Sequence, residues 1–425
     1  MDKLVQSPNG ITRPSEYKVN YVRLHTQTSD TPLDITKMIN YVEIYESIYS
    51  PFLTVNVNIT DNLSLTDLLP LMGEEFIEVD IRGADNLTGL IGQTFYIYKV
   101  ADRTKVSDKT YTYTLGCISP GAIFDMNLKI SQAMFGQPSD LVKDKLCGTS
   151  LAVDKPVYAH PTKYPVSYIS NYWSPIRNIK YLCDRSVSKD TGSASYLFFE
   201  TIKGFNFIPL DILASQESVG DYFYTNNIQV PDIAAQQQII HNLYVDEQFN
   251  YINRIMTGAY GNRALFVDTM SKQYQYQYYD FLESYNKFAR LNEKPFATDT
   301  ATRRINSVFR KLTYASKAIP NMPDQHSPEW FKQRLTELAS INSQTINFDA
   351  VGRFNIQVGN VVNVVVPVST VSASDAVRKD LSSTIDRALS GRYMITGLKH
   401  MLDRERHTIH VQASKDSMVK IPSRG

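Results

Sequence analysis

The clearest pattern in the chain lies at residues 53–60, where apolar and polar positions alternate without a break. The apolar positions are Leu53, Val55, Val57 and Ile59. Successive side chains of a β-strand point to opposite faces, so this stretch predicts a strand with one buried and one solvated face. Similar patterns, separated by turn residues, fill residues 17–118. About six short strands in a row are typical of one antiparallel barrel or sandwich.

Helical spacing begins after Pro120. A short helix is predicted over 138–146, stopped by Gly148. A second helix is predicted to follow Ser174, a good N-cap, with Pro175 in the first turn, where its missing N–H costs nothing. The apolar residues on one face of that helix are Ile176, Ile179, Leu182 and Cys183.

A hairpin is predicted next, with arms at 196–201 and 205–210 around Lys203-Gly204. A further helix is expected to begin at Pro231. Its buried residues would be Ile239, Ile240 and Leu243. These elements together predict an α+β unit distinct from the first barrel.

Strand patterns return at Ile252, with a turn at 258–262 and extended stretches at 264–268 and 274–278. A mostly polar insertion runs from 283 to 323. A helix then starts with Ser327 as its expected N-cap. The apolar residues at helical spacing are Trp330, Phe331, Leu335 and Leu338. The final part is strand-like at 354–358, 361–366, 393–396 and 407–411, interrupted by a polar segment at 369–387.

The two β-rich regions share an order of elements. Gly73 leads one strand and Gly359 another; each strand is followed by a hairpin, opened at 96–98 in the first region and at 393–395 in the second. The return arms are 111–115 and 407–411. Residue identity between the regions is low, and any two antiparallel meanders share some of this order. The hypothesis is that one barrel is built twice, against the alternative of two unrelated meanders.

The expected fold class is therefore α+β and β-rich. It comprises two similar antiparallel β-barrels, an α+β connecting domain and a helical insertion. The expected domain ranges are 16–118 for the first barrel, 119–245 for the connecting domain, 246–282 with 344–417 for a discontinuous second barrel, and 283–343 for the insertion. A length of 425 residues fits about three domains.

Composition narrows the function classes. Forty-four basic and forty-three acidic residues leave a formal charge of +1, which provides no basic surplus for holding nucleic acid. Tyrosine is abundant, with 27 residues, and suits half-buried strand positions and protein contacts. The three cysteines, Cys117, Cys147 and Cys183, lack CxxC spacing and argue against a disulfide framework or a zinc site. The polar start and the short apolar runs predict a protein made in the cytoplasm with no stable membrane insertion.

No set of residues predicts catalysis. His407 and His410 have HxxH spacing, but on a strand their rings would point to opposite faces. No nucleotide-binding, hydrolase or metalloprotease motif is present. The expected catalytic, cofactor-binding and metal-binding residues are therefore none, and no cofactor is expected. Tyr274, Tyr276 and Tyr278 would line one face of a strand; we favour a packed aromatic face or a subunit contact over a stacking surface for sugars or bases.

Five stretches in order resemble the baseplate central hub proteins of contractile-tailed bacteriophages, which are related to the hub part of the type VI secretion spike protein. The first is YVEIYESIYSPFL at 41–53 with LPLMG at 69–73. The second joins SPI at 174–176 to YLFFE at 196–200 and GFNF at 204–207. The others are IMTG at 255–258 with YGNR at 260–263 and Asp268, WFKQRL at 330–335 with FNIQVGNVV at 354–362, and LSGRYMIT at 389–396 with His400 and KDS at 415–417. The N-terminal 15 residues and the polar stretch at 284–323 take no part in the resemblance.

The resemblance implies a structural virion protein of the tail baseplate and no enzyme. It implies a homotrimer whose six barrels form a pseudo-sixfold ring between the sixfold tail tube and the threefold spike, as part of the DNA ejection conduit. Implied partners are a tail tube or tube-initiator protein, the central spike protein, other baseplate proteins and the tape measure protein, with DNA only in transit. Two alternatives remain open: a glycan-binding adhesin or receptor-binding tail protein that uses residues 274–278, and a wall hydrolase.

Overall fold

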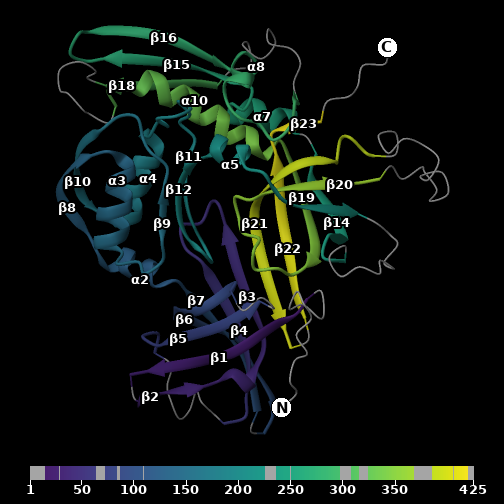
Figure 1. The fold of residues 1–425 in the computed structure, drawn as a ribbon. Helices are drawn as coiled ribbons and strands as arrows, with labels where there is room; N and C mark the ends of the chain where they lie inside the picture. Colours follow the sequence, from purple (N-terminus) through teal and green to yellow (C-terminus); the bar gives the residue numbers. More distant parts are fainter. Residues whose placement is uncertain are drawn as a thin grey trace.

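The computed structural model describes residues 15–27, 29–63, 72–83, 87–108, 110–224, 236–248, 250–296, 308–314, 324–367, 385–404 and 406–419. The predicted fold class is confirmed: the chain is rich in β-structure, with two barrel units, an α+β connecting unit and an insertion that contains a helix. Figure 1 shows the first barrel at one end of the molecule, and the connecting unit and second barrel side by side above it.

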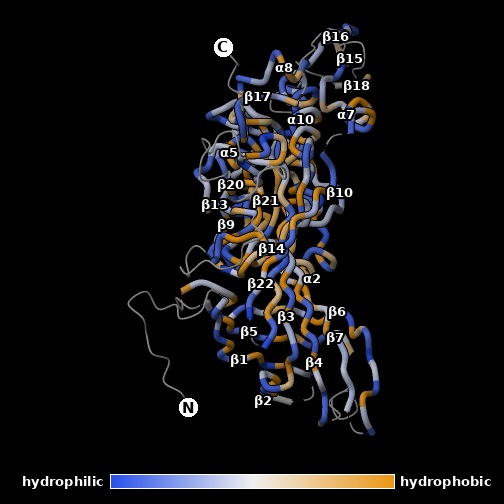
Figure 2. The backbone as a smooth tube through the Cα atoms, turned by 90° about the vertical axis from the view of Figure 1, so that its right-hand side faces the viewer, coloured by the Kyte–Doolittle hydropathy of each residue, from blue (hydrophilic) through white to orange (hydrophobic). Residues whose placement is uncertain are grey.

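Seven strands form the first barrel unit: β1 (Tyr17–Thr26), β2 (Ser29–Asp34), β3 (Ile39–Ser47), β4 (Thr54–Asp61), β5 (Phe76–Gly83), β6 (Gly89–Ser107) and β7 (Thr110–Ile118). A 3-10 turn at Thr36–Met38 connects β2 to β3. The strand order is β2-β1-β5-β6-β7-β4-β3. Val55 and Val57 of β4 are fully buried, as the alternation of residues 53–60 predicts. Figure 2 shows the hydrophobic positions alternating with hydrophilic ones along these strands.

The connecting unit follows in sequence from residue 120. Its elements are α2 (Pro120–Asn127), β8 (Ile130–Gly136), α3 (Pro138–Asp140), a π-helix (Leu141–Ser150), β9 (Val157–Ala159), β10 (Val166–Trp173), α4 (Pro175–Arg185), β11 (Tyr196–Thr201), β12 (Gly204–Pro209) and α5 (Leu210–Ser215). The predicted cap of α4 is confirmed, since the Ser174 hydroxyl accepts from the Arg177 N–H at 3.3 Å. The predicted hairpin corresponds to β11 and β12. Gly148 does not stop the preceding helix, which continues as a π-helix to Ser150.

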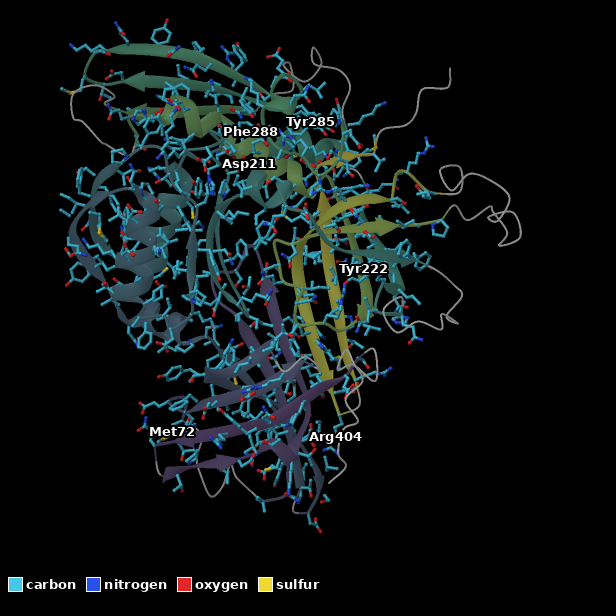
Figure 3. The ribbon with its side chains drawn as sticks, in the orientation of Figure 1. Met72, Asp211, Tyr222, Tyr285, Phe288 and Arg404 are labelled. Carbon is cyan, nitrogen blue, oxygen red and sulfur yellow. The ribbon has the colours of Figure 1, made fainter. Side chains whose placement is uncertain are left out.

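The second barrel closes on itself. Its strands are β13 (Ser218–Tyr224), β14 (Ile239–Glu247), β19 (Gln344–Val351), β20 (Val361–Val365), β21 (Gly391–Asp403) and β22 (His407–Lys415). They pair in the cyclic order β13-β14-β19-β22-β21-β20, and β20 returns to β13. β13 runs parallel to both of its neighbours, so the barrel departs from the expected antiparallel pattern at this one strand. Tyr222 is fully buried inside this barrel (Figure 3).

The insertion packs against the end of the second barrel that lies away from the first. It contains α7 (Tyr251–Thr257), β15 (Gly261–Asp268), β16 (Gln273–Asp280), α8 (Phe281–Ser284), a 3-10 turn (Tyr285–Lys287), β17 (Lys294–Pro295), β18 (Val308–Tyr314), α10 (Ser327–Ser340) and a second 3-10 turn (Ile341–Ser343). β17 pairs with β23 (Ser417–Met418). Strands β16, β15 and β18 form a separate sheet, and α10 packs against β15 and β16 (Figure 1).

Three expected elements are wrong. Residues 239–247 form a strand and not a helix, because Leu243 and Val245 alternate with exposed neighbours and β19 supplies backbone partners. The predicted start of that helix at Pro231 lies outside the described residues. Residues 251–257 form α7, capped by Asn250 and ended by Gly258 in the left-handed region at φ 80°, and not a strand.

In the stretch 354–358, buried apolar side chains alternate with the exposed Asn355 and the half-buried Gln357, but the stretch is not a strand. Its backbone bonds to side chains instead of a ladder: Gln357 N–H donates to Asn360 and Val358 N–H to Glu46. Helix α10 starts one residue after its cap, His326, and not after Ser327. Its Leu335 and Leu338 are only half-buried, since polar residues such as Thr336 and Glu337 occupy the buried face through hydrogen bonds.

Strand pairing also differs from the expected domain ranges. β13 falls within the range 119–245, and β14 crosses its end at 245, but the two strands pair with β20 and β19 of the second barrel, respectively. β15 and β16 fall within 246–282 but belong to the separate sheet. The partners of these strands lie more than a hundred residues away or in the insertion, so local patterns do not reveal them.

We expect Leu53→Ala to lower the free energy of unfolding by about 2–5 kcal/mol, because a fully buried side chain is removed from the core of the first barrel. Thr54→Ala is the matched control on the solvated face, and its effect should stay within about 0.5 kcal/mol. Urea unfolding of both variants tests this. Equal effects would contradict the assignment of the two faces.

Candidate assembly interface

The two barrels share one continuous sheet. β3 of the first barrel pairs antiparallel with β21 of the second, from Tyr41 opposite Asp403 to Ser47 opposite Gly397. We call this pairing the seam. Thus β3 has β4 on one edge and β21 on the other. Figure 3 shows Arg404, which follows β21, beside the first barrel; its guanidinium donates to Asn40 Oδ1 and to the Ile39 carbonyl.

The two barrels have the same strand order. Without β2, the first unit reads β1-β5-β6-β7-β4-β3 across the sheet, and the second reads β13-β20-β21-β22-β19-β14. When the six strands of each unit are numbered along the sequence, both units have the spatial order first, fourth, fifth, sixth, third, second. The units differ in their first strands, because β1 runs antiparallel to β5 whereas β13 runs parallel to β20. This common order supports the hypothesis, drawn from the sequence, that one barrel is built twice.

A β-bulge falls at the same place in both units. Between β6 and β7 the register shifts after Ile97 opposite Cys117, and it resumes at Lys99 opposite Gly116. Between β21 and β22 it shifts after Ile395 opposite Ala413, and it resumes at Gly397 opposite Gln412. Because a bulge adds one residue at a defined point of a ladder, the shared bulge sets a residue-by-residue correspondence. Tyr98 corresponds to Thr396, and the residues that follow correspond in order.

Side chains close the seam on both faces of the sheet. On the inner face, Ile44 and Leu398 are buried. On the outer face, Lys399 forms an ion pair with Glu43 at 2.7 Å, and its ammonium lies 5.7 Å from the Tyr45 ring centroid. The seam is therefore an apolar contact covered by a partly exposed ion pair.

Glu46 joins three parts of the chain. It lies on β3, is 3% exposed, and accepts the Ile202 N–H of the connecting unit at 2.8 Å and the Val358 N–H of the second barrel segment at 3.0 Å. Burial raises the pKa of Glu46 to about 7, although the two hydrogen bonds act in the opposite direction. A single carboxyl group thus satisfies backbone donors from two different units.

Glu200 makes a parallel connection beside it. This buried residue of β11 accepts the Leu53 N–H of the first barrel at 3.0 Å and pairs with Lys155 at 2.7 Å. Glu46 of the first barrel therefore accepts a hydrogen bond from the connecting unit, and Glu200 of the connecting unit accepts one from the first barrel. The two carboxyl groups bond to the backbone at positions far apart in the sequence.

A buried histidine pair lies beside the middle of the seam, where His400 is opposite Ile44. His400 Nδ1 and His407 Nε2 are 3.0 Å apart, and the Phe354 ring contacts both imidazoles. Burial lowers the pKa of His400 to about 3 and holds that of His407 well below its usual range. Gly352 lies against the His407 ring, where a Cβ would come within 2.2 Å of it. Both imidazoles are therefore neutral at pH 7.

The repeat leaves one seam edge unpaired in each barrel unit. β14 corresponds to β3, and beyond Ile240 its edge away from β19 has no strand partner among the described residues. β6 corresponds to β21, and after Ile97 its edge away from β7 is likewise unpaired within the described ranges. Figure 2 shows the β6–β7 hairpin extending beyond the first barrel.

Apolar residues on these two edges are more exposed than the corresponding residues in the seam. Leu398 is 3% exposed under β3, whereas its counterpart Val100 on β6 is 40% exposed. Ile44 is fully buried, whereas its counterpart Val245 on β14 is only half-buried. Both edges thus carry apolar side chains at positions that the seam covers.

The outer face of the shared sheet is concave and polar. A shallow depression of about 450 Å³ spans both barrels at the seam. Its lining includes Tyr45, Asn242, Tyr244, Asn347, Asp349, Lys399, His410 and Gln412. Asp349 contacts His410 across this face, and Lys399 pairs with Glu43. The positive charge of Lys399 is therefore matched locally by the Glu43 carboxylate.

The structure separates the residues that sequence analysis considered for chemistry. His407 is buried, whereas His410 lies on the outer face, as strand geometry predicts. Among the described residues no group of three or more histidine, cysteine or acidic side chains is arranged to hold a metal ion. The three cysteines are buried thiols, with pKa values raised by burial. No helix in the described ranges is long and apolar enough to cross a membrane.

The tyrosines of β16 are not packed within the chain. Tyr274, Tyr276 and Tyr278 are 72%, 45% and 54% exposed. A packed aromatic face inside a single chain is therefore excluded, and the alternative of a contact with another molecule stays a prediction. Sequence reasoning missed Glu46 and Glu200, because their partners are backbone groups that only the fold brings together.

Comparison with known proteins gives structural relatives only. No family model matches the sequence, and no curated protein matches it either. A tail protein from Neisseria meningitidis MC58 aligns over 94% of this chain and 97% of its own, with 12% identity and a TM-score of 0.54. The 43 kDa tail protein of prophage MuSo2 from Shewanella oneidensis aligns over 94% and 99%, with 10% identity and a TM-score of 0.55. The fold is therefore that of solved phage tail proteins.

We expect Glu46→Gln to flatten the pH dependence of stability between about pH 4.5 and 7. A folded-state pKa of about 7 exceeds the usual value of 4.5, so the stability that Glu46 contributes is fully present below pH 4.5 and is lost as the pH rises through 7. The variant should also lose about 1–3 kcal/mol at pH 4.5, because its amide group faces a backbone donor. Urea unfolding across this pH range tests both points, with exposed Glu217→Gln as the control. An unchanged slope in Glu46→Gln would refute the assignment.

The pair of His400 and His407 has the opposite effect on the pH dependence of stability. Folded pKa values below 6.5 mean that the pair favours folding above pH 6.5, and that this stability is lost as the pH falls toward 3. His400→Leu removes one of the two sites, so the variant should lose less stability than wild type between pH 6.5 and 4. Subtracting the unfolding free energies of wild type and variant at each pH isolates this contribution. A difference that does not vary with pH would contradict it.

Proposed function

We propose that this protein is a structural, non-enzymatic component of a phage tail baseplate, in which three copies form a ring of six barrels. The ring would serve as the central hub, between a sixfold tail tube and a threefold spike. The observation that carries the proposal is the duplicated barrel with one seam formed and two matching edges unpaired. The fold shared with solved tail proteins supports the same assignment.

The internal seam is a template for the contact between copies. β14 corresponds to β3, and β6 corresponds to β21, so β14 of one copy can pair with β6 of the next as β3 pairs with β21. Because the two edges differ from each other, the contact is heterologous, and a rotation of one third of a turn between copies closes it into a ring of three. Two barrels in each of three chains give six similar units, which is what a junction between sixfold and threefold symmetry requires.

The correspondence also gives a register. Thr54 pairs with Ile118 and Thr345 pairs with Ser414, which are corresponding positions on β7 and β22. Tyr45 lies opposite Thr54, and Glu247 lies opposite Thr345 after a bulge at Asp246 that β3 lacks. Tyr45 and Glu247 therefore correspond. Lys399 corresponds to Ala101 by the shared bulge. Tyr45 lies opposite Lys399 in the seam, so Glu247 of one copy would lie opposite Ala101 of the next.

Ring closure would place the concave outer face of the shared sheet toward the central channel. That face is polar, and its acidic and basic groups pair with one another locally. With a formal net charge of +1, the protein offers no strong attraction for a phosphate backbone, which suits DNA in transit. The partners we propose are the tail tube or a tube-initiator protein, the spike, other baseplate proteins and the tape measure protein. The site of action would be the virion tail, after synthesis in the host cytoplasm.

The register predicts a specific cross-link. Facing residues of an antiparallel pair have Cα atoms about 4.5–5.5 Å apart, within the range of a disulfide. The double variant Glu247→Cys with Ala101→Cys should therefore give covalent species up to three chains, about 145 kDa for chains of 48.3 kDa, on non-reducing gels. Reduction should return the monomer.

Two controls sharpen this test. Each single cysteine variant should remain monomeric on the gel, since the native cysteines are buried. Pairing Ala101→Cys with Tyr158→Cys, an exposed residue of the connecting unit, should also give no ladder. A chain that stays monomeric in solution, with or without a spike partner, would overturn the ring. Ladders that continue beyond three chains would indicate an open filament.

A further inference from the structure

The sheet β16-β15-β18 leaves one face uncovered. Its inner face packs on α10, where Phe266 contacts Phe331 and Gln277 accepts from Lys332 Nζ at 2.7 Å. The outer face carries exposed aromatic side chains: Tyr274, Tyr276, Tyr278 and Phe309. This face lies in the insertion, outside both barrels and away from the edges that form the proposed ring (Figure 1).

β16 is an unprotected edge strand. It pairs with β15 on one side, and among the described residues its other edge has no strand partner. Its sequence, QYQYQYYD, contains no proline and no charged residue before Asp280. Exposed edges are normally protected by charges, proline or bulges, because their free N–H and C=O groups pair readily with another strand. This edge has none of these protections and is open to strand addition.

A cation is held directly above this strand. Arg263 lies on β15 opposite Tyr278, and its guanidinium carbon is 4.5 Å from the Tyr276 ring centroid and 5.6 Å from that of Tyr278. The side chain therefore reaches across onto β16. Its Nε is buried and has no hydrogen-bond partner in the described part of the chain. Stacking on two rings fixes the guanidinium in advance, which reduces the entropy lost when a carboxylate binds.

We propose that the free edge of β16 binds an extended acidic segment of another protein as an added strand, with a carboxylate of that segment paired to Arg263. An added strand lies about 4.8 Å from β16, so its outward side chains reach the guanidinium above Tyr276 and Tyr278. Lys311 is the second cation on this face. The carboxylate at the end of the face, Asp280, is buried and caps α8. The charge of the surface therefore complements an acidic strand.

A sugar or a nucleic acid fits this face less well. The Tyr274 and Tyr276 rings stand at 82° to each other, so they offer no flat surface for successive sugar rings or bases. Arg263 already covers one face of Tyr276. Two cations provide little attraction for a polyanionic backbone. These contacts favour a polypeptide over the glycan ligand that the exposed tyrosines first suggest.

The test uses three fluorescein-labelled peptides, (Val-Glu)4, (Val-Gln)4 and (Val-Lys)4, and the full-length chain. We expect fluorescence anisotropy to show (Val-Glu)4 binding at least about tenfold more tightly than (Val-Gln)4, with no binding of (Val-Lys)4. Arg263→Glu should weaken binding of (Val-Glu)4 at least about tenfold. Arg263→Lys should retain part of it, because the charge remains but the planar fork is lost.

The matched control is Lys272→Glu, a cation in the turn of the same hairpin. It should change the affinity less than about threefold, because a local contact and not general charge sets the binding. Equal affinity for (Val-Glu)4 and (Val-Gln)4, no binding of (Val-Glu)4, or an Arg263→Glu variant that binds normally would each overturn the proposal. Binding of maltohexaose in place of (Val-Glu)4 would favour a sugar site. None of these outcomes affects the cross-link that tests the ring.

Discussion

The arrangement of this molecule depends on two buried carboxyl groups that bond to backbone N–H groups of other units. Glu46 reaches from the first barrel to the connecting unit and to the second barrel, and Glu200 reaches from the connecting unit back to the first barrel. A buried carboxyl without such donors would be strongly unfavourable, and buried N–H groups without an acceptor would be nearly as costly. The buried carboxyl groups and the buried N–H groups therefore each depend on the other for a hydrogen-bond partner. Together they hold β3 in the position where it pairs with β21.

The pairing of β3 with β21 shows how neighbouring barrels can join edge to edge. β3 and β21 satisfy each other inside one chain, while their counterparts β14 and β6 present equivalent edges with partly exposed apolar residues. Each chain thus contains one complete seam, formed by β3 and β21, and two unpaired edges, on β14 and β6, that could form a second seam with neighbouring copies. Three such seams between copies would turn three chains into a closed ring. Among the described residues of the first barrel no pairing joins β1 to β3, whereas the corresponding strands β13 and β14 pair in the second barrel.

Much of the fold could be predicted from local patterns, and the part that could not depended on distant partners. The alternation at 53–60 and the capped helix after Ser174 are properties of neighbouring residues, and both were found. Residues 239–247 were misassigned because Ile239, Ile240 and Leu243 also fit a helical face, and the strand is stabilised by β19, a hundred residues later. The segment 354–358 has strand-like alternation, but its Val358 N–H bonds to Glu46. The shared bulge, which sets the correspondence between units, leaves no local mark in the sequence.

A density map of the purified oligomer, at a resolution that separates strands, tests the central claim most directly. The account predicts three chains whose six barrels repeat around one axis, with β14 of each chain antiparallel to β6 of the next and Glu247 opposite Ala101. The concave polar face should line the central opening. A map in which both edges remain unpaired, or in which the copies meet through other surfaces, would contradict the account.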